Sequence, residues 1–243
     1  METRILGRTG LKVSVLSFGC GAVGGLMVKG STSDQERAVA RAIELGINYF
    51  DTAPMYGNGE SERNLGRVLK LLNRPKVVVG TKIWLEAAWL ESKADIARVI
   101  ADSMEASLQR LGMDCVDLYQ LHNPISGSGR EGTIDPKTVR EQVLPAFEHL
   151  RQQGKARHIG FTALGDPPAI HSVADAFETA QVSYNLLNPS AGTPLPDGYP
   201  AQDFGNFLSR AHAGGVGTIG IRALAGGALS GLETRHPSGL QSV

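Results

Sequence analysis

The chain has 243 residues, and its 24 Lys and Arg residues balance its 24 Asp and Glu residues, so the formal net charge at pH 7 is zero. This balance excludes the bulk attraction that draws strongly basic proteins to nucleic acids or acidic membranes, and we expect a small, locally recognised partner. The sequence has no apolar run near the roughly 20 residues of a membrane helix, and its charged start, METRILGRTG, is unlike a secretion signal. The length suits a single domain.

The cysteine content indicates a reducing compartment. Cys20 and Cys115 lie in unrelated contexts and make neither a CxxC pair nor a disulfide framework. We therefore predict a cytoplasmic protein. His, Cys and carboxylate residues are not spaced like metal ligands, so we predict no metal site.

The first predicted elements are a hairpin, a strand and a helix. The runs TRILG (3–7) and LKVSV (11–15), joined by RTG, predict the hairpin, and the next strand ends near Phe18, before the loop GCGAVGG. Ser33 and Glu36 have the spacing of a capping box, which predicts the start of a helix that ends at Gly46. The strand INYF (47–50) follows.

Helices and strands alternate along the rest of the chain. We predict helices over 62–72, 96–112, 135–154, from 166 onward and over 203–213, and strands over 77–81, 115–121, 157–162, 180–185 and 216–221. The pairs Asp135–Pro136 and Asp166–Pro167 are typical of an N-cap followed by proline in the first helical turn. The count is seven strands between residues 15 and 221, and the alternation implies a parallel sheet.

Two architectures fit this alternation: an open doubly wound sheet and a closed eight-stranded barrel. An open sheet gathers its functional groups near one switch point, whereas a barrel draws them from the carboxyl ends of many strands. Polar residues end or follow five successive predicted strands: Asp51, Lys82, His122, Thr162 and Asn185. This distribution favours a (β/α)8 TIM-barrel type of fold with an N-terminal hairpin.

The chain is too short to close an eight-stranded barrel. An eighth strand and its helices would have to come from residues 222–243, which are too few for them. We therefore predict a single barrel domain over residues 1–243 with about seven of the eight strands, lacking the last βα unit like a C-terminally truncated form of a longer domain.

Three of the strand-end residues, with Tyr56 five positions past the strand that ends at Asp51, suit proton delivery to a carbonyl group. Tyr56 could donate the proton, although an unperturbed tyrosine has a pKa of about 10 and needs a nearby positive charge to stabilise its phenolate. Lys82 could supply that charge, Asp51 could be its counter-ion, and His122 could orient the carbonyl oxygen. Singly, each has an ordinary structural explanation, such as a turn cap or a solvated strand end. Together they predict an active site.

At these residues the sequence resembles a known family. The run FDTAPMYGNGESERNLGRVL, the pair TK ending at Lys82 and the segment DLYQLHNP around His122 are similar to the aldo-keto reductase superfamily, and the resemblance extends through ALAGGALSG at 223–231. It implies that Asp51, Tyr56, Lys82 and His122 form the catalytic tetrad of that family. Tyr56 would then be the general acid in reduction and the general base in oxidation.

The resemblance also implies a nicotinamide cofactor, with NADP(H) favoured over NAD(H). The implied cofactor contacts are Gly21, Ala22, Asp51, Asn123, Thr162, Gln181, Arg222, Ala223, Leu224 and Gly226. Structural alternatives exist: the loop at Gly21 would be merely flexible, Asn123 would cap the turn at Pro124, and Gln181 would be a strand-edge residue. Ile221 stands where many relatives stack an aromatic ring on the nicotinamide, so aliphatic contact is expected there, or none.

The substrate side is less specific. Trp84 and Trp89 follow the strand that ends at Lys82, and either line a pocket for an apolar or sugar-like substrate or cover the outside of the barrel. The glycine-rich loop at 123–135 is expected to be mobile. We predict an NAD(P)-dependent oxidoreductase that reduces an aldehyde or ketone, or oxidises an alcohol or sugar. The alternative is a cofactor-binding regulatory or interaction protein with little or no turnover. Oligomeric state stays open.

Overall fold

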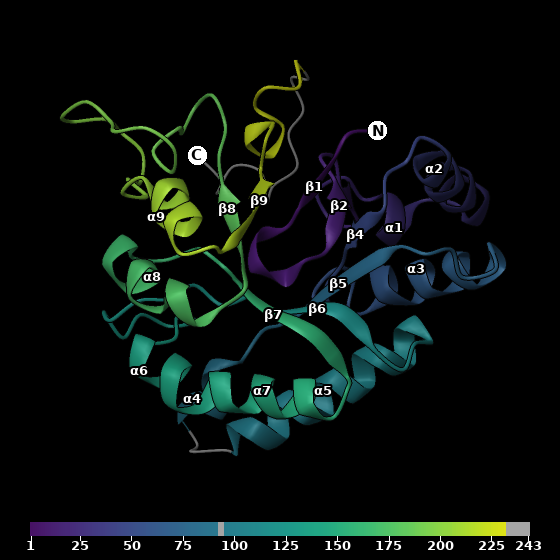
Figure 1. Ribbon diagram of the computed structural model, residues 1–243, viewed down its shortest axis with the longest axis horizontal. Helices are drawn as coiled ribbons and strands as arrows, with labels where there is room; N and C mark the ends of the chain where they lie inside the picture. The colour runs from purple at the N-terminus through teal and green to yellow at the C-terminus, as the bar shows by residue number, and fades with distance from the viewer. Residues whose placement is uncertain (92–94, 232–243) are drawn as a thin grey trace.

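A curled sheet of seven parallel strands forms the centre of the computed structural model, which describes residues 1–91 and 95–231 (Figure 1). The strands follow one another in chain order: β3 (Phe18–Gly19), β4 (Tyr49–Asp51), β5 (Val78–Ile83), β6 (Val116–Leu121), β7 (Ala156–Thr162), β8 (Thr179–Ser183) and β9 (Gly217–Ile221). Chain order in an all-parallel sheet is the order of a TIM-type barrel, whereas a doubly wound sheet reverses at a switch point. The predicted fold class is confirmed, and the sheet is a half-barrel. Residues 232–243 lie outside the described residues, so the missing last βα unit stays a prediction.

The predicted N-terminal hairpin is also confirmed. Strand β1 (Thr3–Ile5) pairs antiparallel with β2 (Lys12–Ser14) across the turn η1 (Gly7–Thr9). Arg8, in that turn, donates hydrogen bonds of 2.9, 2.7 and 2.5 Å to the carbonyl oxygens of Gly214, Asp175 and Phe177. These carbonyls precede β8 and β9, so the hairpin lies at the amino ends of the strands.

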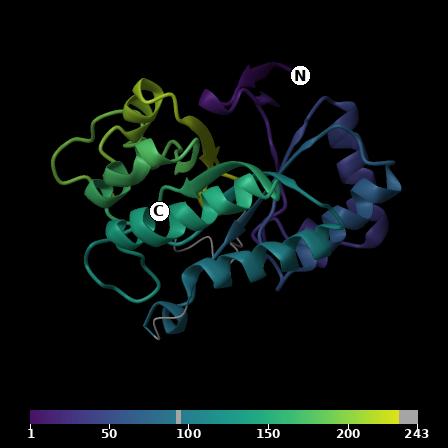
Figure 2. The same cartoon turned by 60° about the horizontal axis from the view of Figure 1, so that its bottom comes forward.

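Helices pack on the outer face of the curled sheet (Figure 1, Figure 2). They are α1 (Leu26–Lys29), α2 (Thr32–Glu44), α3 (Glu60–Leu71), α4 (Ala87–Glu91), α5 (Ile96–Leu111), α6 (Pro136–Thr138), α7 (Leu144–Gln152), α8 (Pro167–Val173) and α9 (Phe207–Ala213). The short η3 (Ala174–Ala176) follows α8, and η4 (Ala225–Gly227) follows β9. The core between sheet and helices includes the ring pair Tyr119–Phe147, whose centroids are 4.9 Å apart. In the parts of the chain that the structure describes, no helix could cross a membrane.

The predicted capping box is wrong. Helix α2 begins at Thr32, and its N-cap is Ser31, whose hydroxyl oxygen accepts a hydrogen bond from the Asp34 amide at 3.2 Å. Ser31 has the extended backbone that an N-cap requires. The helix therefore starts two residues before the position predicted from Ser33. Glu36 then lies inside the helix and pairs with Arg67 of α3.

Two other helices depart from their predicted extents. The helix that follows Asp135 contains a π-helical turn, η2 (Val139–Val143), directly before Pro145. Proline has no amide hydrogen and collides with the carbonyl four residues earlier, and the wider turn accommodates it. Helix α9 begins at Phe207 instead of 203, because Asp203 accepts a 2.8 Å hydrogen bond from the Gly205 amide and forms a turn there.

Candidate active site

Lys82 is the centre of the candidate site. Its side chain extends from β5 and is fully buried, and its ammonium donates to Asp51 Oδ2 at 2.5 Å, to the Thr52 carbonyl at 2.9 Å and to the Tyr56 hydroxyl at 3.2 Å. Three donor hydrogens thus meet three acceptors. Burial lowers the pKa of Lys82, but the negative charge of Asp51 and the contact with Tyr56 outweigh burial and raise the pKa above its ordinary value. The ammonium therefore stays charged at neutral pH.

Tyr56 stands over this ammonium on the loop that follows β4. The loop is closed by hydrogen bonds from the Tyr56 amide to the Ala53 carbonyl and from the Gly59 amide to the Pro54 carbonyl, at 3.1 and 2.7 Å. The Lys82 ammonium lies 4.8 Å from the centre of the Tyr56 ring. Burial raises the pKa of Tyr56, and Lys82 opposes that effect. The phenol is consequently protonated at neutral pH, beside a cation that favours its phenolate.

His122 completes the convergence at the carboxyl end of β6. Its backbone amide donates to the Ile83 carbonyl at 2.8 Å, and its ring meets Tyr56 and Trp84 edge-on, with centroid distances of 5.9 and 6.1 Å. Burial, together with the charges of Lys82 and Arg222, lowers the pKa of His122 to about 3. The imidazole is therefore neutral. Its Nδ1 atom is buried and has no hydrogen-bond partner among the described residues.

Asp51 has a second set of partners that sequence reasoning missed. Its Oδ1 atom accepts hydrogen bonds from the Tyr49 hydroxyl at 3.0 Å, Gln120 Nε2 at 3.2 Å and Gln181 Nε2 at 2.6 Å. Strand periodicity could have identified two of them, because Tyr49 precedes Asp51 by two residues, Gln120 precedes His122 by two, and such residues share a face of a strand. Gln181 was predicted to contact the cofactor, and in this structure its amide nitrogen binds Asp51.

Two other residues predicted to contact the cofactor, Asn123 and Thr162, differ in whether their side chains already have partners. Asn123 is fully buried, and its amide accepts from the Leu85 backbone amide and donates to the Leu85 carbonyl, both at 2.8 Å. It therefore ties β6 to the loop after β5. Thr162 ends β7 in register with Gln181, and its buried hydroxyl has no partner in the described parts of the chain. Thr162 is thus open to a ligand, whereas the Asn123 amide is engaged.

The loops after β3 and β9 border the tetrad. A methyl group added at Gly21 would lie 3.9 Å from the Tyr56 ring, so the loop that holds Gly21 and Ala22 adjoins the phenol. After β9, positive φ angles of 57°, 49° and 64° occur at Arg222, Ala225 and Gly226, a conformation that is uncommon for residues other than glycine. Ala223 and Leu224, between them, are exposed. That these two loops contact the cofactor stays a prediction.

The two tryptophans have different positions. Trp84 meets His122 edge-on, at the site, whereas Trp89 lies in α4 and packs against the hydrophobic core. The glycine-rich loop at 123–135, which was expected to be mobile, is held in part by its own contacts, since Ile125 and Ile134 are buried and form a backbone bridge. The covering role therefore fits Trp89, whereas a substrate pocket at Trp84 stays a prediction.

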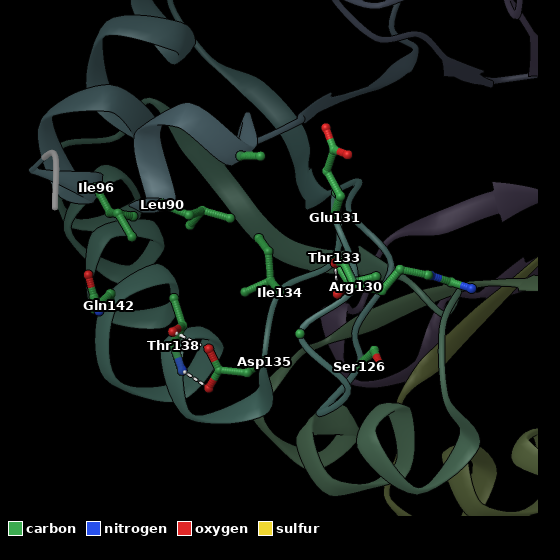
Figure 3. Close-up of a pocket in the computed structure, with 13 residues that line it drawn as sticks. Leu90, Ile96, Ser126, Arg130, Glu131, Thr133, Ile134, Asp135, Thr138 and Gln142 are labelled. Atoms are coloured by element: carbon green, nitrogen blue, oxygen red, sulfur yellow. Dashed lines mark hydrogen bonds between the residues drawn. The ribbon is translucent and has the colours of Figure 1, made fainter. Parts of the chain in front are cut away.

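A pocket of about 380 Å³ lies on the other side of this loop (Figure 3). Leu90, Ile96 and Ile134 form its apolar side, and Asp135 accepts hydrogen bonds from the amide and hydroxyl of Thr138 at its polar side. The described residues that line it include none of the tetrad. The pocket is therefore separate from the candidate active site.

Taken together, the half-barrel and its strand ends define a TIM-type protein in which the polar side chains of Asp51, Tyr56, Lys82 and His122 gather at the carboxyl face. The sequence profile described as "Aldo/keto reductase family" matches residues 15–241, and the chain belongs to that family. The predicted family membership is confirmed.

Individual relatives support the same assignment. The chain is 37% identical over 166 residues to L-galactose dehydrogenase of Arabidopsis thaliana, covering 68% of this chain and 49% of the relative. It is 35% identical over 216 residues to a putative voltage-gated potassium channel subunit beta of Schizosaccharomyces pombe, covering 86% of this chain and 55% of the relative. Aldo-keto reductase AKR11C1 from Bacillus halodurans superposes with a TM-score of 0.71 at 26% identity, covering 98% of this chain and 70% of that one. The chain thus spans about half the length of these curated relatives.

Proposed function

We propose that the protein is an NAD(P)-dependent oxidoreductase that reduces an aldehyde or ketone to an alcohol, or oxidises an alcohol or sugar in reverse. The observation that carries the proposal is the position of the Lys82 ammonium, which bonds Asp51 and the Tyr56 hydroxyl at once. A buried cation held by a carboxylate and aimed at a phenol is suited to proton transfer by that phenol.

Each tetrad residue has a task in this proposal. In reduction, Tyr56 donates its proton to the developing alkoxide, and Lys82 stabilises the phenolate that remains. In oxidation the phenolate takes a proton from the alcohol. His122, neutral above about pH 3, donates one hydrogen bond to the substrate oxygen and so orients it toward Tyr56. Asp51 keeps Lys82 charged and directed.

The described residues fit a nicotinamide. Thr162 Oγ1, Asn185 Nδ2 and Gln120 Oε1 are buried polar atoms without partners in the described segments, and a carboxamide has the donors and acceptor to satisfy such atoms. When bound, the nicotinamide ring donates or accepts the hydride. The residues proposed to hold the cofactor are Gly21, Ala22, Asp51, Thr162, Gln181, Arg222, Ala223, Leu224 and Gly226. Asn123 is not among them, because its side-chain amide already bonds the Leu85 backbone. NADP(H) is proposed ahead of NAD(H) on the family resemblance.

For the substrate we propose a small carbonyl compound or sugar. The Trp84 ring beside His122 offers a flat apolar surface to the face of a sugar or an aliphatic chain. The named activity of the Arabidopsis relative, L-galactose dehydrogenase, supports a sugar among the candidates. We also propose that the protein is cytoplasmic, because Cys20 and Cys115 are both free.

The decisive experiment is Tyr56→Phe in the full chain. NADPH and NADH are each titrated against the protein, and a panel of aldehydes and sugars is then assayed by the change in nicotinamide absorbance. We expect turnover to fall at least about a hundredfold while cofactor affinity is kept. Tyr119→Phe is the matched control, because that buried hydroxyl faces Ser103 of α5 and not the site. Full turnover by Tyr56→Phe would reject the proposal.

A second candidate is a cofactor-binding regulatory or interaction protein with weak turnover. The name of the Schizosaccharomyces relative, a putative potassium channel subunit beta, favours it. The same titration separates the two functions: nicotinamide binding with no turnover of any panel substrate would support the regulatory protein.

A further inference from the structure

We propose that Tyr49 and Gln120 are positioning residues of the active site, whose hydrogen bonds to Asp51 Oδ1 orient the carboxylate so that Oδ2 holds Lys82 against Tyr56. This inference rests on the proposed function and deepens it. Tyr49 donates from β4 at 3.0 Å and Gln120 from β6 at 3.2 Å, and both side chains are buried, with exposed fractions of 2% and 0%. Together with Gln181 of β8, which donates at 2.6 Å, these residues hold the carboxylate from three strands besides that of Lys82.

Two glycines leave the space that these donors occupy. A methyl group added at Gly80, in register with Asp51, would lie 2.7 Å from the Tyr49 hydroxyl. A methyl group added at Gly160, in register with Gln120, would lie 3.3 Å from Gln120 Cγ and overlap Thr179. A side chain at Gly80 would collide with the Tyr49 hydroxyl, and one at Gly160 would press on Gln120, so the two glycines leave room for the donors.

The two donors are suited to hold a negative charge over the working pH range. Burial, and then the charge of Asp51, raises the pKa of Tyr49 well above its ordinary value, so its hydroxyl remains a donor. The Gln120 amide does not titrate, and its register partner on β5 is Lys82 itself. Asp51 Oδ1 therefore meets neutral donors, and Oδ2 is left to face the single ammonium.

Removing either donor, Tyr49 or Gln120, should affect the pKa of Tyr56 in two ways, and both raise it. The negative charge of Asp51 is less neutralised, and Asp51 acts to raise the pKa of Tyr56. The carboxylate also turns more freely, so Lys82, which acts to lower that pKa, is held less firmly at the phenol. The pKa of Tyr56 should therefore rise in each variant.

The test titrates Tyr56 without any substrate. A stopped-flow pH jump on the full chain records tyrosinate absorbance before alkaline unfolding, and subtracting the same variant carrying Tyr56→Phe isolates the signal of Tyr56. Tyr49→Phe and Gln120→Met each delete the donor and nearly keep the volume, and we expect the pKa of Tyr56 to rise by about one unit in both. Tyr119→Phe, whose hydroxyl faces Ser103, should leave it unchanged.

A second measurement separates positioning from general loosening. With any substrate found in the panel, kcat of Tyr49→Phe and Gln120→Met should fall about tenfold while KM stays within about twofold. An unchanged Tyr56 titration in both variants, or an equal shift in Tyr119→Phe, would overturn the inference. A shifted titration in a chain that turns over no substrate would instead reject the proposed function and leave the positioning role standing. Should Tyr49→Phe not fold, Gln120→Asn, which withdraws the amide by one methylene group, joins Gln120→Met.

Discussion

The ion pair of Lys82 and Asp51 joins the carboxyl ends of β5 and β4 at 2.5 Å, with 0% of the lysine side chain and 14% of the aspartate side chain exposed. A pair buried to this degree is sensitive to the loss of either member, because the remaining charge is left without a partner. The Lys82–Asp51 pair is therefore expected to contribute to the stability of the fold as well as to the site.

Replacing Lys82 with Met tests that dependence. Asp51 would lose its cation in a buried position, and we expect the free energy of unfolding to fall by about 3–5 kcal/mol. The pKa of Tyr56 should rise further, because Lys82 is the principal group that lowers it, and turnover should fall at least about a hundredfold. Urea denaturation and steady-state assays measure the two effects.

The double variant Lys82→Met/Asp51→Asn separates charge from structure. It removes both charges, so most of the lost stability should return, while turnover should not. Lys155→Met is the control, because its partner Glu105 is half exposed and such pairs contribute at most about 1 kcal/mol. A double variant as unstable as the single variant would contradict the interpretation.

The neutral imidazole of His122 predicts a specific pH dependence of stability. Its pKa is about 3 in the folded protein and 6.5 in the unfolded chain, so between these values the unfolded chain binds a proton that the folded protein does not. Stability therefore decreases as the pH falls through this window, at up to about 1.4 kcal/mol per pH unit from this residue. The contribution is fully present above pH 6.5.

Replacing His122 with Asn should reduce that decrease. Urea denaturation at several pH values between 7 and 4 would show a shallower slope in the variant than in the wild type. Identical slopes for wild type and His122→Asn would show that the imidazole titrates normally. In turnover assays, we expect no step near pH 6.5 from His122.

Asn123 should behave as a structural bridge. Asn123→Ala removes its hydrogen bonds to the Leu85 backbone and leaves that amide and carbonyl buried, for a loss of about 2–3 kcal/mol in the free energy of unfolding. Affinity for NADPH should change little, because the amide already binds protein. Gln152→Ala, at an exposed helical position, is the control for stability. Weakened cofactor binding with unchanged stability would instead support the cofactor contact implied by the family resemblance.

The sequence was informative where a local pattern determines the structure. Helix α5 ends at Gly112, whose φ of 62° suits glycine, and the residues from Ile96 to Leu111 alternate buried and exposed faces as their spacing predicts. Asp51, Lys82 and His122 could be grouped because they end or follow separate strands, and parallel strands bring their carboxyl ends together. Tyr56 could be added because it lies in the loop just after Asp51.

Contacts between distant residues could not be predicted from such patterns. Asn123 binds Leu85, which is 38 positions away, and Gln181 binds Asp51, which is 130 positions away. Both depend on strand register, which no single segment of sequence encodes. The capping box failed for a different reason: Ser31 and Ser33 are chemically equivalent, and only the backbone conformation distinguishes them.

Gly66 provides a test of the packing behind the site. In an exposed helix, Gly→Ala is stabilising by up to about 1 kcal/mol. At Gly66 of α3, however, the added methyl group would lie 2.3 Å from the carbonyl oxygen and 2.8 Å from the Cα atom of Leu111, at the end of α5. Backbone cannot yield cheaply, so α3 and α5 must separate, and we expect Gly66→Ala to lower the free energy of unfolding by about 1–3 kcal/mol.

The effect of Gly66→Ala should reach the site through Glu62. This buried carboxylate accepts from Arg110 of α5 at 2.6 Å and from Thr81, the neighbour of Lys82, at 2.6 Å, so moving α5 from α3 disturbs both contacts. We therefore expect reduced turnover along with reduced stability, measured by assay and urea denaturation. Gly127→Ala is the matched control, because no atom lies within 4 Å of its added methyl group, and its stability should stay within about 0.5 kcal/mol of wild type. A stabilised Gly66→Ala would mean that helix propensity outweighs the contact with Leu111, and that α3 and α5 are less closely packed than the structure indicates.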